Sequence, residues 1–338
     1  MKTNLFLLGM AVAAFSSCTN EEVTDVAQNR AIKFNQFVEN NTREVQEVES
    51  LSSFYVFGKF GEISNSYTTQ IFNNESQDTP YYWVANKFYI FGAYADGNNG
   101  KIEDVTFNSA KKQLVFTNYS PDDTKDLVAA ISDEVESGDN PTTNDNKVSL
   151  TFHHMLSQVK FTFNTTDGKE YQIKISNLKI NAVKTSTGNI ALSESNNVTI
   201  NWENTSAIKE DYDMYPVISD VANENKRASS ESKLVIPQNG TDQLNVMFTA
   251  TVKGGGLDKT ANFTANLSVA ENIAGGNSNA NTWIPGYRYN YTAEINAKMI
   301  SEGGENPEVL YPITFNAIVS DWEKAEDQNT TPQASSVP

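Results

Sequence analysis

Alternation of apolar and polar residues is the feature that most constrains the fold of this chain. Such period-two runs, rich in β-branched and aromatic residues, are typical of half-buried β-strands. Eight segments show the alternation: Ser53–Phe60, Lys87–Ala95, Lys147–Phe163, Tyr171–Val183, Gln243–Val252, Ala261–Val269, Tyr287–Ala297 and Tyr311–Trp322. In the last segment, one face collects four apolar residues: Ile313, Phe315, Ala317 and Val319. The pattern predicts an all-β fold.

Clusters of Asn, Gly, Asp and Ser, such as ADGNNGK and KGGGLDK, separate the predicted strands and favour turns. No long amphipathic helix interrupts them, and closely spaced strands with polar turns indicate antiparallel β-sandwiches. A length of 338 residues permits two domains. The polar loop SGDNPTTNDNK places the boundary, so we expect one sandwich over residues 44–150 and a second over 151–325. Residues 326–338 lack any pattern and are expected to be disordered.

The N-terminus has the features of an export signal. Lys2 precedes an apolar run, Leu5–Phe15, which is too short to span a bilayer as a permanent helix. Two serines follow directly before Cys18, the only cysteine of the chain. This arrangement resembles the lipobox of bacterial lipoproteins, in which the signal, here residues 1–17, is removed and the cysteine is acylated. The resemblance implies an anchor in the outer membrane through Cys18.

The stretch AIKFNQFVENNTREV (Ala31–Val45) reads as a short strand that runs into a polar turn with a lone arginine. Two interpretations are open: an ordinary first strand with a loop after it, or a strand that proteolysis removes. Arginine occurs at only three other positions: Arg30, Arg227 and Arg288. Four side chains are expected to hold the strand against the core: Ile32, Phe34, Phe37 and Val38. Losing it would expose an unpaired strand edge and an apolar groove, which a strand from another chain can fill.

Composition and residue pattern argue against several other function classes. A net charge of −17 excludes the basic footprint of a nucleic-acid-binding protein. The only histidines, His153 and His154, are adjacent in a predicted strand, so they point to opposite faces and do not form a chelating pair. No catalytic triad or convincing carboxylate pair can be assembled. We therefore expect no enzymatic activity, no metal and no cofactor.

The aromatic run PYYWV (Pro80–Val84) raises one alternative function. Tyr81, Tyr82 and Trp83 would form a sugar-stacking platform if all three were exposed. A surface-exposed glycan-binding lipoprotein of a polysaccharide-uptake system is therefore the second hypothesis. Strand alternation favours a different arrangement, in which Tyr81 and Trp83 share one face and Tyr82 lies on the other.

The order of several motifs resembles the fimbrillin family of lipoproteins, the pilins of type V fimbriae. The carrying motifs are SSCTNEE, AIKFNQFVENNTR, FYVFG, YYWVANKFYIFGAYA, DLVAA, LTFHHMLSQVKFTF, WIPGYRYNYTAEI and ITFNAIVSDWE. The resemblance implies two transthyretin-like β-sandwich domains in tandem. It also implies residues 18–43 as a propeptide, which an arginine-specific protease removes at Arg43-Glu44. The family often has a small residue after the arginine, and this chain departs from that pattern with Glu44.

For assembly, the resemblance implies donor-strand exchange with other fimbrial subunits. The last predicted strand is the candidate donor, with Ile313, Phe315, Ala317 and Val319 as its inserted side chains. The alternative is that this segment is merely the last strand of the second domain. The implied location is the outer membrane and then the cell surface, in a fimbrium that functions in adhesion to a host surface or glycan.

Overall fold

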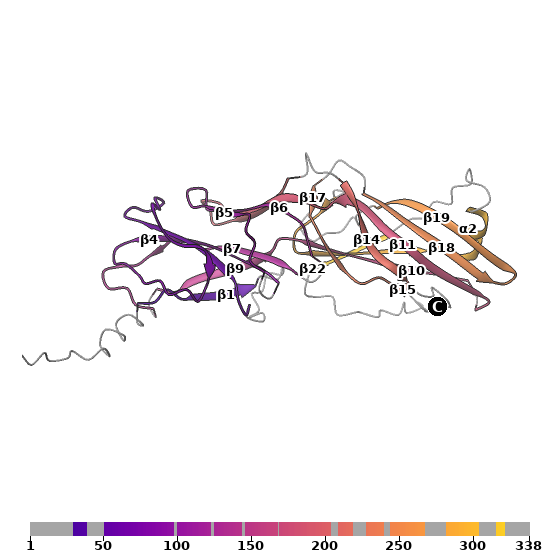
Figure 1. Ribbon diagram of the computed structural model, residues 1–338, viewed down its shortest axis with the longest axis horizontal. Helices are drawn as coiled ribbons and strands as arrows, with labels where there is room; N and C mark the ends of the chain where they lie inside the picture. Colours follow the sequence, from indigo (N-terminus) through magenta and orange to yellow (C-terminus); the bar gives the residue numbers. More distant parts are fainter. Residues whose placement is uncertain are drawn as a thin grey trace, which may run out of the picture.

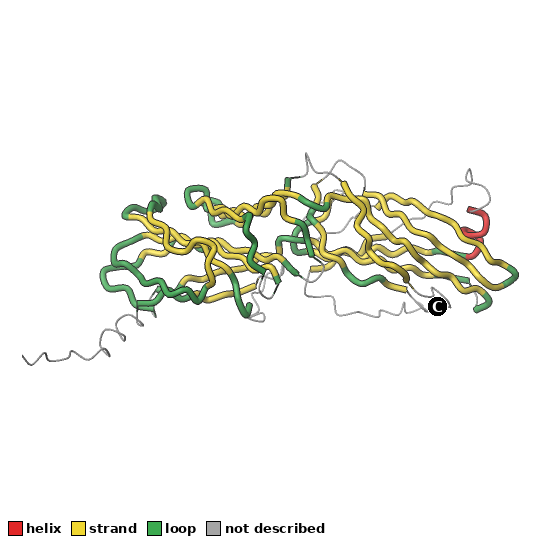
Figure 2. Tube along the Cα trace, in the orientation of Figure 1, coloured by secondary structure: helices red, strands yellow, loops and turns green. Residues whose placement is uncertain are grey.

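A computed structural model describes residues 30–38, 51–97, 100–122, 125–143, 146–167, 169–203, 209–218, 228–239, 244–267, 282–303 and 316–321. Over these residues the chain is almost entirely β-structure, as predicted, with one short helix. The described part is elongated, with two β-bodies arranged end to end (Figures 1 and 2). Five of the predicted site residues lie outside the described part: Cys18, Arg43, Glu44, Ile313 and Phe315.

The first body contains two facing sheets. The larger has the strand order β1-β9-β7-β4-β2-β3, with β8 also paired to β4, and the smaller has the order β13-β12-β6-β5. Its strands are β1 (Phe34–Val38), β2 (Tyr55–Gly61), β3 (Thr69–Ser76), β4 (Phe88–Asp96), β5 (Val105–Asn108), β6 (Gln113–Tyr119), β7 (Leu127–Ile131), β8 (Val135–Glu136), β9 (Val148–His154), β12 (Ser186–Leu192) and β13 (Val198–Trp202).

Strand β4 is the centre of the first body because both of its faces are buried. Ile90 and Tyr94 belong to the apolar cluster that lies between the two sheets. Tyr89 and Phe91, on the opposite face, belong to a second apolar cluster, which also includes residues of β1 and β9. A strand that is apolar on both faces needs cover on both. The β1–β9 ribbon supplies the cover for the second face.

The second body also contains two facing sheets, with the orders β15-β10-β21-β22 and β14-β11-β18-β19, and β16 pairs with β10. One large apolar cluster fills the space between them. The strands of this body are β10 (Ser157–Asn164), β11 (Tyr171–Val183), β14 (Lys209–Ile218), β15 (Ala228–Ser229), β16 (Lys233–Val235), β17 (Gln238–Asn239), β18 (Leu244–Gly254), β19 (Leu257–Leu267), β20 (Thr282–Trp283), β21 (Tyr287–Glu294) and β22 (Asn316–Asp321). Strands β17 and β20 form a separate two-stranded ribbon.

The helix α2 (Ala297–Gly303) follows β21, where the sequence pattern predicts only the end of a strand. The Asn296 side chain accepts a hydrogen bond from the Met299 N–H at 3.0 Å and caps the first turn. Ala297 and Ile300 are buried in the cluster of the second body. Met299 packs against the same cluster, and the Ala297 N–H donates to the Asp167 carboxylate, so hydrogen bonds and apolar contacts together fix the helix.

The sheets do not divide at a single point of the sequence. The expected boundary after Leu150 falls inside β9, and β12 returns from the second body to pair with β6. Trp202, at the end of β13, is buried in the first body, and its indole N–H donates to the Met155 carbonyl at 2.8 Å. Residues 186–202 therefore belong to the first body, although they follow β10 and β11 of the second.

Candidate functional site: the N-terminal strand and the neighbouring cleft

Strand β1 lies at the edge of the larger sheet of the first body and pairs with β9 alone among the described strands. The pairing is parallel and runs from Phe34 opposite Val148 to Val38 opposite Phe152. Just before the strand, the Ile32 N–H donates to the Tyr81 carbonyl at 2.8 Å. A strand at such an edge can be removed without breaking any other pair of strands.

The inward side chains of β1 occupy an apolar slot. Ile32 and Val38 are 5% and 7% exposed, and both belong to the cluster on the outer face of β4. Phe34 packs edge-on against three rings, those of Phe54, Phe72 and Phe91, with centroid distances of 5.8, 5.6 and 5.4 Å. We call the space that Ile32, Phe34 and Val38 fill the β1 slot.

The remaining inward position of β1 is Gln36, which sequence reasoning missed. Its amide nitrogen donates to the Leu51 carbonyl at 2.8 Å, but its Oε1 is buried without a hydrogen-bond partner among the described residues. An unsatisfied buried oxygen costs roughly 1–3 kcal/mol, which weakens the hold of the strand. Phe37 lies on the opposite face, is half-buried and does not join the apolar cluster.

The candidate donor strand is described only in part. Ala317 and Val319 lie in β22, which pairs antiparallel with β21 and places them opposite Tyr291 and Tyr289. In this arrangement the segment is the edge strand of the second body of its own chain. Donation to another chain would require it to leave that edge.

The aromatic run at residues 81–83 does not form a platform. Trp83 is 2% exposed and packs edge-on against Tyr89, with ring centroids 4.6 Å apart. The Tyr81 ring packs against Phe72 at 4.5 Å. Tyr82 alone is exposed, at 47%, so a three-ring sugar-stacking surface is absent from this loop.

The two histidines lie in β9 and are both half-buried. His154 Nδ1 lies 2.7 Å from Asp126 Oδ2, which fixes the ring to the loop before β7. His153 lines a cleft described below. Among the described residues no group of three or more His, Cys, Asp or Glu side chains is arranged to hold a metal ion.

A buried carboxyl lies near the junction of the two bodies. Tyr119 donates a hydrogen bond of 2.9 Å to Asp96 Oδ1, and both residues are buried. Burial raises the pKa of Asp96, although the hydrogen bond from Tyr119 and the charge of Lys125 act in the opposite direction. Burial and the neighbouring Asp96 also raise the pKa of Tyr119. The pair is a buried structural contact that holds the end of β4 to the end of β6.

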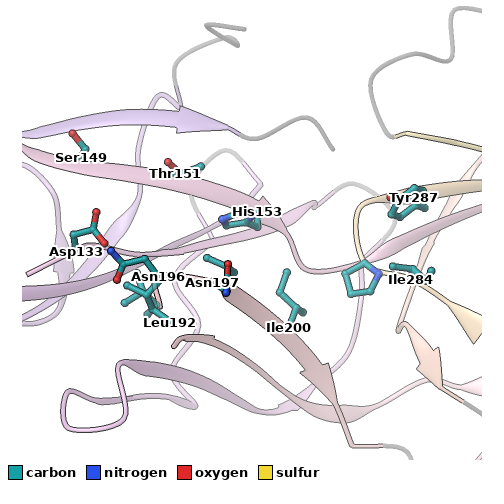
Figure 3. Close-up of a pocket in the computed structure, with 13 residues that line it drawn as sticks. Asp133, Ser149, Thr151, His153, Leu192, Asn196, Asn197, Ile200, Ile284 and Tyr287 are labelled. Atoms are coloured by element: carbon teal, nitrogen blue, oxygen red, sulfur yellow. The ribbon is translucent and has the colours of Figure 1, made fainter. Parts of the chain in front are cut away.

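A cleft of about 650 Å³ runs along the outward face of β9 (Figure 3). Asp133 lies at one end of it and Tyr287 of the second body at the other. The β12–β13 hairpin forms the facing wall. The lining residues are Ile131, Asp133, Ser149, Thr151, His153, Leu192, Asn196, Asn197, Val198, Ile200, Ile284, Pro285 and Tyr287.

No helix within the described residues has the length and apolar character needed to cross a membrane.

The geometry thus defines an all-β protein of two bodies, whose N-terminal strand fills an apolar slot at a sheet edge. The fimbrillin-like family model matches residues 23–322, and the chain belongs to that family. The resemblance predicted from the sequence motifs is therefore confirmed. The search of curated proteins found no match.

Several solved structures match this chain at low sequence identity. A fimbrial protein from Bacteroides vulgatus ATCC 8482 is 15% identical and has a TM-score of 0.54, and the match covers 87% of this chain and all of that one. The fimbrial anchor protein Mfa2 from Porphyromonas gingivalis is 11% identical, with a TM-score of 0.39 and coverage of 87% and 98%. A putative cell adhesion protein from Bacteroides uniformis ATCC 8492 is 15% identical, with a TM-score of 0.43 and coverage of 87% and 98%.

Proposed function

We propose that this chain is a structural subunit of a cell-surface fimbrium that functions in adhesion, and that it assembles by donor-strand exchange. Membership of the fimbrillin-like family supports the fimbrial role. The observation that carries the assembly mechanism is the position of β1, an edge strand that pairs with β9 alone among the described strands and inserts Ile32, Phe34 and Val38 into the β1 slot.

The energetics favour exchange over a permanently empty slot. Each fully buried Ile, Val or Phe side chain contributes roughly 1.5–3 kcal/mol to the free energy of unfolding. When β1 leaves, the contributions of its inward apolar side chains are lost. An incoming strand with the same apolar spacing restores those contacts and pairs again with β9. The result is a joint between two subunits.

The proposed pathway begins with a lipoprotein precursor. The signal over residues 1–17 is removed, Cys18 is acylated, and the precursor is anchored in the outer membrane and then displayed at the cell surface. An arginine-specific protease cuts between Arg43 and Glu44 in the segment that follows β1, and β1 leaves. The donor strand comes from another subunit, with Ile313, Phe315, Ala317 and Val319 as the inserted side chains.

Limited digestion of a chain that starts at Thr19 tests the proposal. An arginine-specific protease should cut rapidly after Arg43 and convert the monomer into SDS-resistant oligomers. Intact mass measurement identifies the cut, and size analysis identifies the oligomers. The Arg43→Ala variant should remain a monomer, while Arg227→Ala should behave like the parent chain. Cleavage that leaves only a stable monomer would limit the chain to a terminal or partner-dependent subunit, and resistance at Arg43 would make β1 an ordinary first strand.

The surface glycan-binding alternative, as drawn from residues 81–83, has little support. Burial of Trp83 and Tyr81 removes the aromatic platform on which that interpretation depended. We propose no catalytic activity, because family membership indicates a structural protein.

A further inference from the structure

The cleft along β9 has no role in the proposed fimbrial assembly, which uses the β1 slot. Strand β9 pairs with β1 over its first five residues, but it pairs with β7 only through His153 and His154. Its first part therefore diverges from β7, and its outward face borders the cleft. The inward residues of β1 and β9 lie together in the apolar cluster on the opposite face of their sheet, so the cleft and the β1 slot are on different faces and are separate sites.

The polar side chains of the cleft are available to a ligand. Thr151 and Ser149 project from β9, Asp133 lies at one end, and Asn196 lies in the turn of the β12–β13 hairpin (Figure 3). These four side chains make no hydrogen bond or ion pair with any other described residue. Together they offer hydroxyl and amide groups, which both donate and accept hydrogen bonds, and a carboxylate, which accepts them.

The absence of positively charged side chains from the cleft lining argues against an anionic ligand. The cleft contains no lysine or arginine among its lining residues, and the chain as a whole carries a net charge of −17. Anionic ligands such as phosphates or acidic glycans require cationic or helix-terminal partners. A neutral ligand rich in hydroxyl groups matches the lining instead.

The end of the cleft at the second body is less polar. Ile284 and Tyr287 lie there, with Ile200 of β13 on the side toward His153 (Figure 3). Pro285, which follows Ile284 in the chain, also lines the cleft. Ligand sites commonly combine apolar and aromatic surface with a few polar groups that fix orientation. The apolar ring faces of a sugar pack well against such a surface, while its hydroxyls reach the polar wall.

We propose that this cleft binds a neutral oligosaccharide, with Thr151, Ser149, Asn196 and Asp133 as hydrogen-bonding partners and Tyr287 with Pro285 as the packing surface. An extended peptide is the less favoured occupant. The part of β9 that does not pair with β7 offers an edge for the main-chain hydrogen bonds that peptides use, but the available side chains come from separate elements and suit the hydroxyl groups of a saccharide better.

Binding is measured on the uncleaved monomer, so the result is independent of assembly. Maltohexaose, cellohexaose, xylohexaose and mannohexaose are titrated by calorimetry, with sialyllactose as the acidic comparison. Thr151→Val removes one hydroxyl at constant shape, and Asn196→Gly removes the amide while keeping a residue suited to the backbone φ of 58°. Each change should weaken saccharide binding roughly three- to tenfold, the effect of one lost hydrogen bond.

Matched controls use the same substitutions away from the cleft. Thr106→Val lies on an exposed position of β5, and Asn65→Gly lies in a turn with a φ of 60°. Both should bind like the parent chain. Absence of saccharide binding, equal effects of cleft and control variants, or preference for sialyllactose would each overturn the proposal. Saturation of the cleft by a neutral extended peptide that no saccharide displaces would assign it to a peptide instead.

Discussion

At the scale of single residues, Phe34 helps to hold β1 in its slot through aromatic contacts, although it is only half-buried. It meets three aromatic rings edge-on, and such pairs stabilise beyond the area they bury. Phe37, three residues further along, is also half-buried but lies outside the apolar cluster. The two phenylalanines therefore form a natural pair for comparison.

Phe34→Ala should lower the free energy of unfolding of the uncleaved chain by about 2 kcal/mol, less than for a fully buried aromatic because the ring is half-buried. Phe37→Ala should lower it by less than about 1 kcal/mol, as for positions outside the core. Urea denaturation followed by tryptophan fluorescence measures both. Equal losses for the two variants would mean that the strand is not held through the face that carries Ile32 and Val38.

The second prediction at this scale concerns Asp96, whose burial raises its pKa above the ordinary value of 3.8. The folded chain then binds this proton more tightly than the unfolded chain. The contribution of Asp96 to the free energy of unfolding therefore falls as pH rises from 3.8 through its folded pKa.

Asp96→Asn should abolish this decline while keeping an oxygen that accepts the Tyr119 hydrogen bond. The measurement is the difference in unfolding free energy between the parent chain and the variant, taken at intervals from pH 3.5 to 7. Asp104→Asn, at an exposed position, is the control. A difference curve for Asp96→Asn that is flat over this range would contradict the prediction.

At the scale of elements, the proposed assembly requires β1 to separate from β9. Asn35 and Ser149 are register partners, and both are exposed. Because Cys18 is the only native cysteine, a chain that starts at Thr19 and carries Asn35→Cys with Ser149→Cys has one possible disulfide. Adjacent strands lie about 4.8 Å apart, which is within the range that disulfides span.

The disulfide should hold β1 in place after cleavage at Arg43, so the oxidised protein should stay monomeric and polymerise only after reduction. Size-exclusion chromatography before and after dithiothreitol measures this. A control disulfide between Thr251→Cys and Thr260→Cys joins register partners of β18 and β19 in the second body, and it should leave polymerisation unchanged. Growth of the oxidised β1–β9 protein would exclude the β1 slot as the acceptor.

At the scale of the whole molecule, two bodies share the chain in an interleaved way. Strands β12 and β13 interrupt the second body to complete the smaller sheet of the first. The linked strands β11 and β12 cross from one body to the other with two residues between them. The cleft runs along this junction, with Tyr287 from the second body at one end, so the site depends on both bodies.

The strands themselves were predictable because side chains alternate between faces with a period of two. That local rule located part of the strands of each body and the apolar spacing of Ile32, Phe34 and Val38. It missed β3, β6, β12, β13 and β14, and it joined β9 and β10 into one segment. The same rule places Phe37 on the face opposite Val38, so the expectation that both side chains hold the strand against the core was inconsistent with it. The rule also did not identify Gln36 as the fourth inward residue. An inward face is recognised by its apolar residues, and Gln36 is polar.

The sequence by itself therefore determined the all-β class, the family, and the presence of a strand ahead of a lone arginine. Tertiary structure decided which strands pair, because pairing joins residues far apart in the chain and depends on contacts that no local pattern encodes. In the tertiary structure β1 pairs in parallel with β9, and β12 pairs with β6. Trp83 is buried, and Thr151, Asn196 and Tyr287 line one cleft.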